Sequence, residues 1–123
     1  MILGTGIDII EVERVAQKIE KGQGFRELVF ATEEIAFCES KAHKYQHYAA
    51  RFAAKEAFFK AIGTGWANGT AYHEIIITHD EHGKPLLKLA GQTAQTLSHI
   101  DMQKVHVSLS HLKDMAAAVV VVG

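Results

Sequence analysis

Apolar positions recur with different periods along the chain, and the pattern predicts both helices and strands. Residues 44–62 have apolar side chains at helical spacing, so we expect a long helix there, which ends at the glycines Gly63 and Gly65. Residues 104–110 alternate strictly between apolar and polar side chains, as in a strand with one buried face. Residues 115–122 do not alternate, which predicts a last strand covered on both faces, with a second subunit as a candidate for part of that cover.

Weaker patterns account for most of the remaining chain. In the first third of the chain we expect a strand within residues 1–10 that ends near Asp8, a helix over 11–21 and a short helix capped by Thr32. Further along we expect a hairpin of 72–79 with 85–89, and a helix over 91–102. Together the elements predict an α+β fold in which a mostly antiparallel sheet packs against the long helix. No repeat, low-complexity segment or linker interrupts them, so we expect residues 1–123 to form a single domain.

The composition is that of an ordinary globular protein. Hydrophobic residues make up 48% and charged residues 22% of the 123 positions, and the formal net charge is −1. Near-neutrality argues against a broadly basic nucleic-acid binder, but it leaves room for a local anion site. The lone Cys38 rules out an internal disulfide, the first residues do not resemble a signal peptide, and the longest apolar run is only strand-sized. We therefore expect a cytoplasmic protein without a membrane partner.

Charge is distributed unevenly along the chain. Residues 1–40 contain four basic and eight acidic side chains, whereas residues 41–60 contain five basic side chains against a single acid, Glu56. A basic helix followed by a glycine-rich loop is a candidate phosphate site, although most basic helix faces are simply solvated.

Two isolated carboxylates suggest more specific chemistry. Asp8 interrupts an apolar strand, and it either caps the following helix or binds a cation. Glu56 lies four residues before Lys60, so the two either form a surface ion pair or belong to a site. Two carboxylates beside a cationic helix face are what Mg²⁺ binding to a substrate phosphate requires. A zinc site is not favoured, because the spacing of His43 and His47 lacks the accompanying glutamate and no cysteine pair is present.

Four segments together resemble the holo-(acyl-carrier-protein) synthase family, the small bacterial-type 4′-phosphopantetheinyl transferases. The segments are Gly6-Ile7-Asp8, the block from Arg51 to Ala61, Gly63-Thr64-Gly65, and Val107 to His111. The resemblance extends over nearly the whole chain and keeps the order of the family's motifs. It implies an enzyme that transfers the phosphopantetheine arm of coenzyme A to a serine of an acyl carrier protein and releases adenosine 3′,5′-bisphosphate.

The resemblance also implies roles for individual residues. By this likeness Asp8 and Glu56 bind Mg²⁺, Lys60 lies near the pyrophosphate of coenzyme A and acts in catalysis with them, and Arg51, Gly63 and His111 line the coenzyme site. Arg51 and His111 are suited to the ribose phosphate. The family's proteins are trimers with the coenzyme at the subunit boundary, which fits a last strand that has no polar face.

The carrier-binding surface follows from the same resemblance. Family members dock the acidic carrier through basic residues on and after the first helix, and Arg14, Lys21 and Arg26 match that region. Here Gly22 and Gly24 stand where relatives often have further basic residues, so the carrier preference stays open. Whether acylated coenzyme A is a donor, whether Mn²⁺ replaces Mg²⁺, and which group takes the serine proton also stay open.

Two other functions remain as alternatives at this point. One is a small Mg²⁺-dependent nucleotide phosphohydrolase that uses the same carboxylates and basic helix. The other is a non-catalytic sensor of coenzyme or nucleotide that works as a trimer. Both are weaker, because neither explains why four segments match one family in order.

Overall fold

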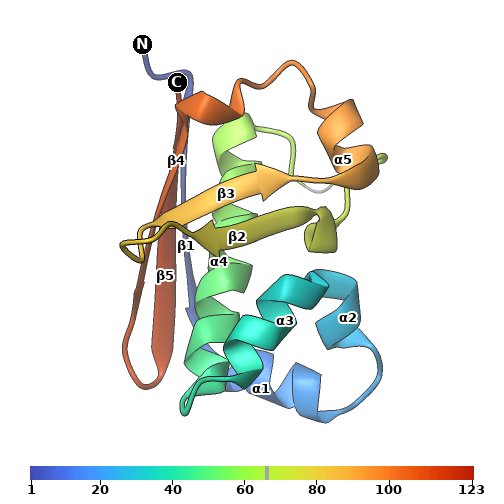
Figure 1. The fold of residues 1–123 in the computed structure, drawn as a ribbon, viewed down its shortest axis with the longest axis vertical. Helices are drawn as coiled ribbons and strands as arrows, with labels where there is room; N and C mark the ends of the chain where they lie inside the picture. The colour runs from blue at the N-terminus through green and yellow to red at the C-terminus, as the bar shows by residue number, and fades with distance from the viewer. Residues whose placement is uncertain (66) are drawn as a thin grey trace.

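A long central helix lies between two antiparallel sheets in the computed structural model, which describes residues 1–65 and 67–123 (Figure 1). The helix is α4 (Lys44–Ile62). On one side of it lies a three-stranded sheet in the order β1 (Gly4–Glu11), β5 (Met115–Val122), β4 (Val105–His111). On the other side lies the hairpin of β2 (Ile75–His79) and β3 (Pro85–Leu89). The α+β fold with antiparallel pairing is thereby confirmed.

Short helices complete the fold around one end of α4 and around the hairpin. They are α1 (Val12–Glu20), α2 (Phe25–Val29), α3 (Thr32–Glu39) and α5 (Gly91–Thr96), with single 3₁₀ turns η1 (Tyr72–Glu74) and η2 (Met102–Lys104). In Figure 1 the first three helices gather around the N-terminal half of α4, while both chain ends lie near its C-terminal end. None of the helices in the described ranges is long and apolar enough to cross a membrane.

Two glycines let β1 lie directly against α4. A Cβ on Gly4 would come within 1.9 Å of the carbonyl oxygen of Ala61, and a Cβ on Gly6 equally close to that of Ala57. No larger side chain fits there, since the obstacles are helix backbone atoms. The pattern Gly4-Thr5-Gly6 therefore sets the distance between strand and helix, and it also determines how close Asp8, two residues further on the same face, lies to the helix.

The structure corrects four of the expected boundaries. The first strand does not end near Asp8, because β1 stays paired with β5 as far as Glu11 opposite Met115. Thr32 is not a cap but the first residue of α3; the backbone N–H of Ala31 donates instead to the Glu34 carboxylate, at 3.0 Å. Residues 72–74 form η1 rather than the start of a strand, and the helix expected over 91–102 ends at Thr96. The short helix α2 has no counterpart in the sequence pattern.

The outer face of the three-stranded sheet is apolar on β1 and β5 and open to solvent in the single chain, whereas β4 has polar residues such as His106 and Ser108 on this face. β5 buries only the face toward α4, through residues such as Val120, whereas Val119 on the opposite face is 38% exposed. On β1 the neighbouring Ile7 and Ile9 are 68% and 66% exposed. Cover on both faces of the last strand therefore requires a second polypeptide on this side.

Candidate active site

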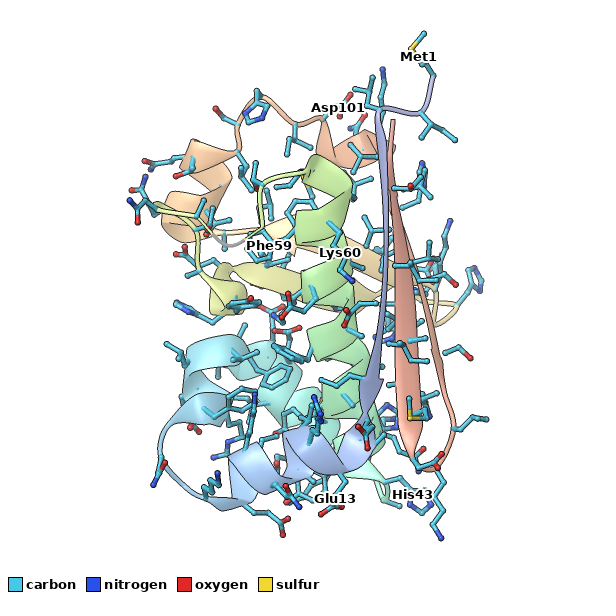
Figure 2. All side chains as sticks on the ribbon, turned by 180° about the vertical axis from the view of Figure 1, so that it is seen from behind. Met1, Glu13, His43, Phe59, Lys60 and Asp101 are labelled. Carbon is cyan, nitrogen blue, oxygen red and sulfur yellow. The ribbon has the colours of Figure 1, made fainter. Side chains whose placement is uncertain are left out.

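Asp8 projects from the middle of β1 toward α4, where it meets Lys60. The Lys60 ammonium donates to the Asp8 carboxylate, Nζ to Oδ1 at 3.1 Å, and to the carbonyl oxygen of Ile7 at 2.9 Å. Figure 2 shows Lys60 reaching from α4 to this strand. Asp8 makes no cap at the start of α1. Of the two alternatives for Glu56, the surface pair with Lys60 is not formed: the ion pair of Lys60 is with Asp8, across the strand–helix contact.

Glu56 lies one helical turn before Lys60 and faces the same region. Burial raises the pKa of its carboxyl above the ordinary range, and the nearby charge of Asp8 raises it further. Its Oε1 accepts a hydrogen bond from the Tyr72 hydroxyl at 3.4 Å, which opposes that rise. Asp8 and Glu56 line one pocket of about 400 Å³, together with Arg14 and Phe52 among others. The two carboxylates found in the sequence therefore do share a site.

The donor set of this pocket fits a divalent cation of the Mg²⁺ kind. The charge of Asp8 raises the pKa of Glu56, and a cation between the two carboxylates would offset this repulsion. Within the described residues there is no cluster of three or more histidine, cysteine or acidic side chains that could hold a metal. A pair of carboxylates suits Mg²⁺, which keeps several waters and binds substrate phosphates, and it does not suit an ion that needs a closed protein cage.

Gly63 ends α4 one turn after Lys60. Its φ of 79° is in the left-handed region, and its N–H donates to the carbonyl oxygens of Phe59 and Lys60. A Cβ at this position would meet no described atom within 4 Å, so the backbone here is open to a ligand. Lys60 and Gly63 are thus adjacent at the C-terminal end of the helix.

Arg51 and His111 do not join the carboxylates within one chain. Arg51 lies nine residues before Lys60, a separation of two and a half helical turns that places the two side chains on opposite faces of α4. Its guanidinium contacts His79 on β2 and the carbonyl of His47. His111 ends β4, and its ring packs against that of His47, with 5.3 Å between centroids. The six expected site residues therefore fall into two groups.

The three basic residues expected to contact the carrier differ in exposure and in their ion-pair partners. Arg14 is exposed and lines the Asp8 pocket, with only an exposed ion pair to Glu11 at 3.4 Å. Lys21 is exposed at the end of α1. Arg26 already has ion-pair partners, Glu27 at 2.7 Å and Glu39 at 3.4 Å. A basic patch is therefore clearest around α1.

Sequence reasoning missed two residues that shape this site. Tyr72 reaches Glu56 from a 3₁₀ turn that lies outside every motif, and no local pattern points to it. Lys55 was counted with the basic helix, yet it is fully buried and bound to Glu34 at 2.7 Å and to the carbonyl oxygens of Tyr72 and Ile75. Its i+4 spacing from Arg51 indicates that the two share a helix face, but not that this face is buried.

Comparison with known proteins connects these residues with one family. The family model described as the 4′-phosphopantetheinyl transferase superfamily matches residues 4–120. A holo-[acyl-carrier-protein] synthase of Cytophaga hutchinsonii is 48% identical over 122 residues, which cover 98% of this chain and 96% of that protein.

Solved structures agree with the sequence comparison. The holo-[acyl-carrier-protein] synthase of Neisseria meningitidis has a TM-score of 0.89 at 34% identity, covering 100% of this chain and 99% of that one. That of Bacillus anthracis, in complex with CoA (3′,5′-ADP), has a TM-score of 0.81 at 35% identity, covering 99% and 96%. The chain therefore belongs to the 4′-phosphopantetheinyl transferase superfamily and is an enzyme of that family.

Proposed function

We propose that this enzyme transfers the 4′-phosphopantetheine group of coenzyme A to a serine of an apo acyl carrier protein, with Mg²⁺, and releases adenosine 3′,5′-bisphosphate. The observation that carries the proposal is the meeting of Asp8, Glu56 and Lys60 on facing surfaces of β1 and α4. Two carboxylates and one ammonium in a pocket suit a pyrophosphate that binds with a divalent cation. The acceptor follows from the names of the related synthases, and the donor from the coenzyme bound in the Bacillus anthracis structure.

The reaction replaces a phosphoanhydride bond of coenzyme A by a phosphodiester bond to the carrier. The serine oxygen forms a bond to the phosphorus that carries pantetheine, the anhydride bond of the pyrophosphate breaks, and the serine proton leaves. Negative charge develops on the departing phosphate. Asp8 and Glu56 would hold the Mg²⁺ that offsets charge on the pyrophosphate. Lys60 has three donors, two of which bind Asp8 and the Ile7 carbonyl, so the third remains for a phosphate oxygen.

The remaining coenzyme contacts are proposed at Gly63, Arg51 and His111. Because Arg51 lies on the far face of α4 from Lys60, a coenzyme that contacts both groups runs between two copies of the chain. The exposed apolar face of β1 and β5 supports this arrangement. Ile7, Ile9 and Val119 are solvent-exposed in the single chain, and a second subunit on this face would bury them. A homotrimer with the coenzyme at its subunit boundaries is the assembly that we propose, with one domain per chain.

The acyl carrier protein is proposed to dock beside α1. Arg14 lines the pocket that contains Asp8 and Glu56, so a carrier bound to Arg14 and Lys21 brings its serine to the carboxylate site. Arg26 can bind the carrier only if its ion pairs with Glu27 and Glu39 break and acidic groups of the carrier take their place. We place the reaction in the cytoplasm.

A mass measurement tests the reaction directly. Purified protein is incubated with apo carrier protein, coenzyme A and Mg²⁺, and the carrier is expected to gain the mass of phosphopantetheine. Asp8→Asn and Glu56→Gln should each lower the turnover by roughly 10² or more, because each removes charge stabilisation from the transferring group. Glu81→Gln is the matched control, since Glu81 is exposed in the hairpin turn and its one ion pair among the described residues is with the exposed His82.

Three results would contradict the proposal. One is an unchanged carrier mass when another transferase modifies the same carrier. Another is release of pantetheine phosphate without any carrier, which would identify a hydrolase. Coenzyme binding that is independent of Mg²⁺ and leads to no turnover would identify a sensor.

A further inference from the structure

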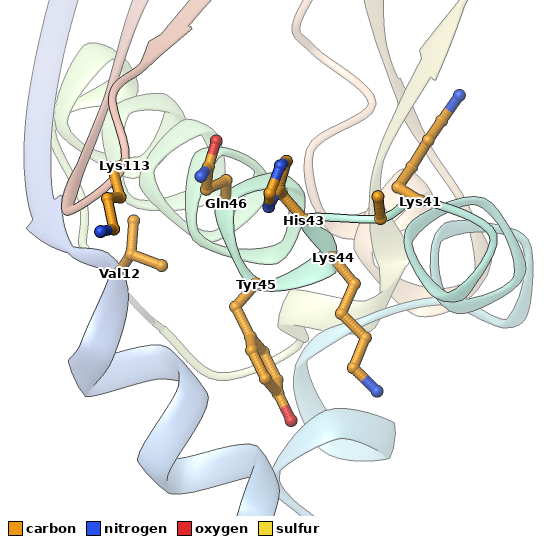
Figure 3. A pocket seen from close by; sticks show the side chains of 8 residues that line it. Val12, Lys41, His43, Lys44, Tyr45, Gln46 and Lys113 are labelled. Carbon is orange, nitrogen blue, oxygen red and sulfur yellow. The ribbon is translucent and has the colours of Figure 1, made fainter.

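Lys55 is a fully buried lysine whose ammonium uses all of its donors inside the protein. Its Nζ donates to the Glu34 carboxylate at 2.7 Å and to two main-chain carbonyl oxygens. Because an ammonium has three donors, none remains for a substrate. The basic residues Lys41 and Lys113 differ, since they are exposed in the wall of a pocket of about 490 Å³ at the N-terminal end of α4 (Figure 3). Lys55 therefore acts on the protein itself and not on a ligand.

The two carbonyl oxygens that Lys55 binds lie at the two ends of the 3₁₀ turn η1. One belongs to Tyr72, the first residue of the turn, at 2.8 Å from Nζ, and the other belongs to Ile75, which follows the turn. The Tyr72 carbonyl also accepts the N–H of Ile75, which closes the turn. A single 3₁₀ turn has few backbone hydrogen bonds of its own, so the ammonium fixes η1 against α4.

Glu34 has partners on both of its carboxylate oxygens. Oε1 accepts the N–H of Ala31 at 3.0 Å as well as the Lys55 ammonium, and Oε2 accepts the N–H of Ile77 on β2 at 3.1 Å. The Glu34–Lys55 pair therefore connects α3, α4, β2 and η1. A buried ion pair adds little net stability, because the cost of removing two charges from water offsets their attraction. Such a pair is better suited to fixing positions.

Tyr72 is bound by two consecutive residues of α4. Lys55 binds its carbonyl oxygen, and Glu56 accepts a hydrogen bond from its hydroxyl at 3.4 Å. The ring of Tyr72 also packs against two phenylalanines of the same helix, with centroid distances of 5.9 Å to Phe52 and 5.4 Å to Phe59. A shift of the main chain at η1 therefore moves the hydroxyl relative to the Glu56 carboxylate.

We propose that the buried Glu34–Lys55 pair positions Glu56 for the cation, by holding Tyr72 where its hydroxyl orients the Glu56 carboxylate. Glu34 and Lys55 are positioning residues, since they act through Tyr72 and have no donor or open face toward the pocket. The inference rests on the proposed function for the role of Glu56, and it adds the residues that fix this side chain. It follows that the pair strengthens cation binding only while the Tyr72 hydroxyl is present.

Cation binding without turnover tests the positioning role. Mg²⁺ is titrated calorimetrically into the full-length protein saturated with coenzyme A, with no carrier present, and the heat of Mg²⁺ with coenzyme A alone is subtracted. Lys55→Met with Glu34→Gln removes both charges together, so that neither is left buried and unpaired. We expect the dissociation constant of Mg²⁺ to rise several-fold, and urea unfolding of the same protein measures its stability separately.

An exposed ion pair between the same parts of the fold supplies the matched control. Lys88 on β3 binds Glu33 on α3 at 3.2 Å, and both side chains are about half exposed. Glu33→Gln with Lys88→Met removes this link between α3 and the hairpin but leaves η1 bound to Lys55. Mg²⁺ should bind this variant as it binds the wild type.

The Tyr72→Phe protein provides the comparison that separates positioning from folding. This substitution removes the hydroxyl and should by itself raise the dissociation constant of Mg²⁺ several-fold. Adding Lys55→Met with Glu34→Gln should then raise it no further, because the link to Glu56 is already missing. A role limited to folding predicts no such dependence on the hydroxyl.

A milder variant serves if the double replacement does not fold. Glu34→Asp keeps the negative charge but withdraws the carboxylate from Lys55 by one methylene group. It should weaken Mg²⁺ binding in the protein that has the Tyr72 hydroxyl and leave it unchanged in the Tyr72→Phe protein.

The outcomes separate this inference from the proposed function. Unchanged Mg²⁺ affinity after loss of the buried pair, or the same weakening with and without the Tyr72 hydroxyl, overturns the positioning role and leaves the transferase proposal standing. Failure of the wild type to bind Mg²⁺ in the presence of coenzyme A contradicts the proposed function itself, and this inference with it.

Discussion

Replacing Gly6 by alanine perturbs the contact that brings β1 to α4. The new Cβ lies 1.9 Å from the Ala57 carbonyl oxygen and 2.8 Å from the Ala61 nitrogen, both of which are backbone atoms that cannot rotate away. Restoring an ordinary contact of 3.4 Å moves the strand from the helix by about 1.5 Å. Overpacking costs about 1–3 kcal/mol, and with backbone on both sides we expect the upper end, about 3 kcal/mol.

The same movement separates Asp8 from Glu56 and Lys60. A misplacement of about 1 Å at a positioned group lowers rates by about 10², so turnover should fall with stability. Urea unfolding measures the free energy of unfolding, and the mass of the carrier measures turnover. Gly83→Ala is the control: Gly83 has a φ of 82° and no atom within 4 Å of its Cβ position, so we expect a loss of about 1 kcal/mol and unchanged turnover. A Gly6→Ala protein as stable and active as the wild type would refute the role assigned to this contact.

Two further substitutions test contacts around the site and the fold. Tyr72→Phe removes the hydroxyl that donates to Glu56, so half-maximal turnover should require several-fold more Mg²⁺ while the free energy of unfolding falls by about 1 kcal/mol or less. An unchanged Mg²⁺ requirement would show that the hydroxyl does not orient the carboxylate. Glu74→Gln weakens the acceptor for Gln92 and Thr93 at the start of α5, costing about 1 kcal/mol at neutral pH. Hydrogen bonds from Thr93 lower the Glu74 pKa below 4.5, so urea unfolding should show this advantage being lost as the pH falls below 4.5; a pH-independent difference would contradict that reasoning.

The sequence predicted the elements whose patterns are long and local. Helix α4 was found with its bounds because apolar residues recur over its whole length and Gly63 ends it in the left-handed region. The end of β1 was misplaced because Asp8 interrupts an apolar run, and only the pairing with β5 shows that the strand continues. Thr32 was expected to cap α3, but the capping position is that of Ala31. The Glu34 side chain accepts a hydrogen bond from the backbone N–H of Ala31.

The sequence predicted which residues belong to the candidate site, but not how they are arranged in space. The motifs brought together Asp8, Glu56 and Lys60, which do lie together, since Gly4 and Gly6 carry no Cβ and let the strand approach the helix. The sequence alone does not show this role of the glycines, because a two-glycine pattern occurs in many structural settings. The burial of Arg51 depends on α3 and β2, which lie far from it in sequence, and no local pattern shows their contact.

The metal position tests the central claim most directly. Crystals grown with Mn²⁺ and coenzyme A, measured for anomalous scattering, should show one peak between the carboxylates of Asp8 and Glu56, at about 2.2 Å from an oxygen of each and beside the pyrophosphate. Bound coenzyme with no peak there, or with a peak that contacts neither carboxylate, would contradict the assignment of Asp8 and Glu56 as the ligands of the cation.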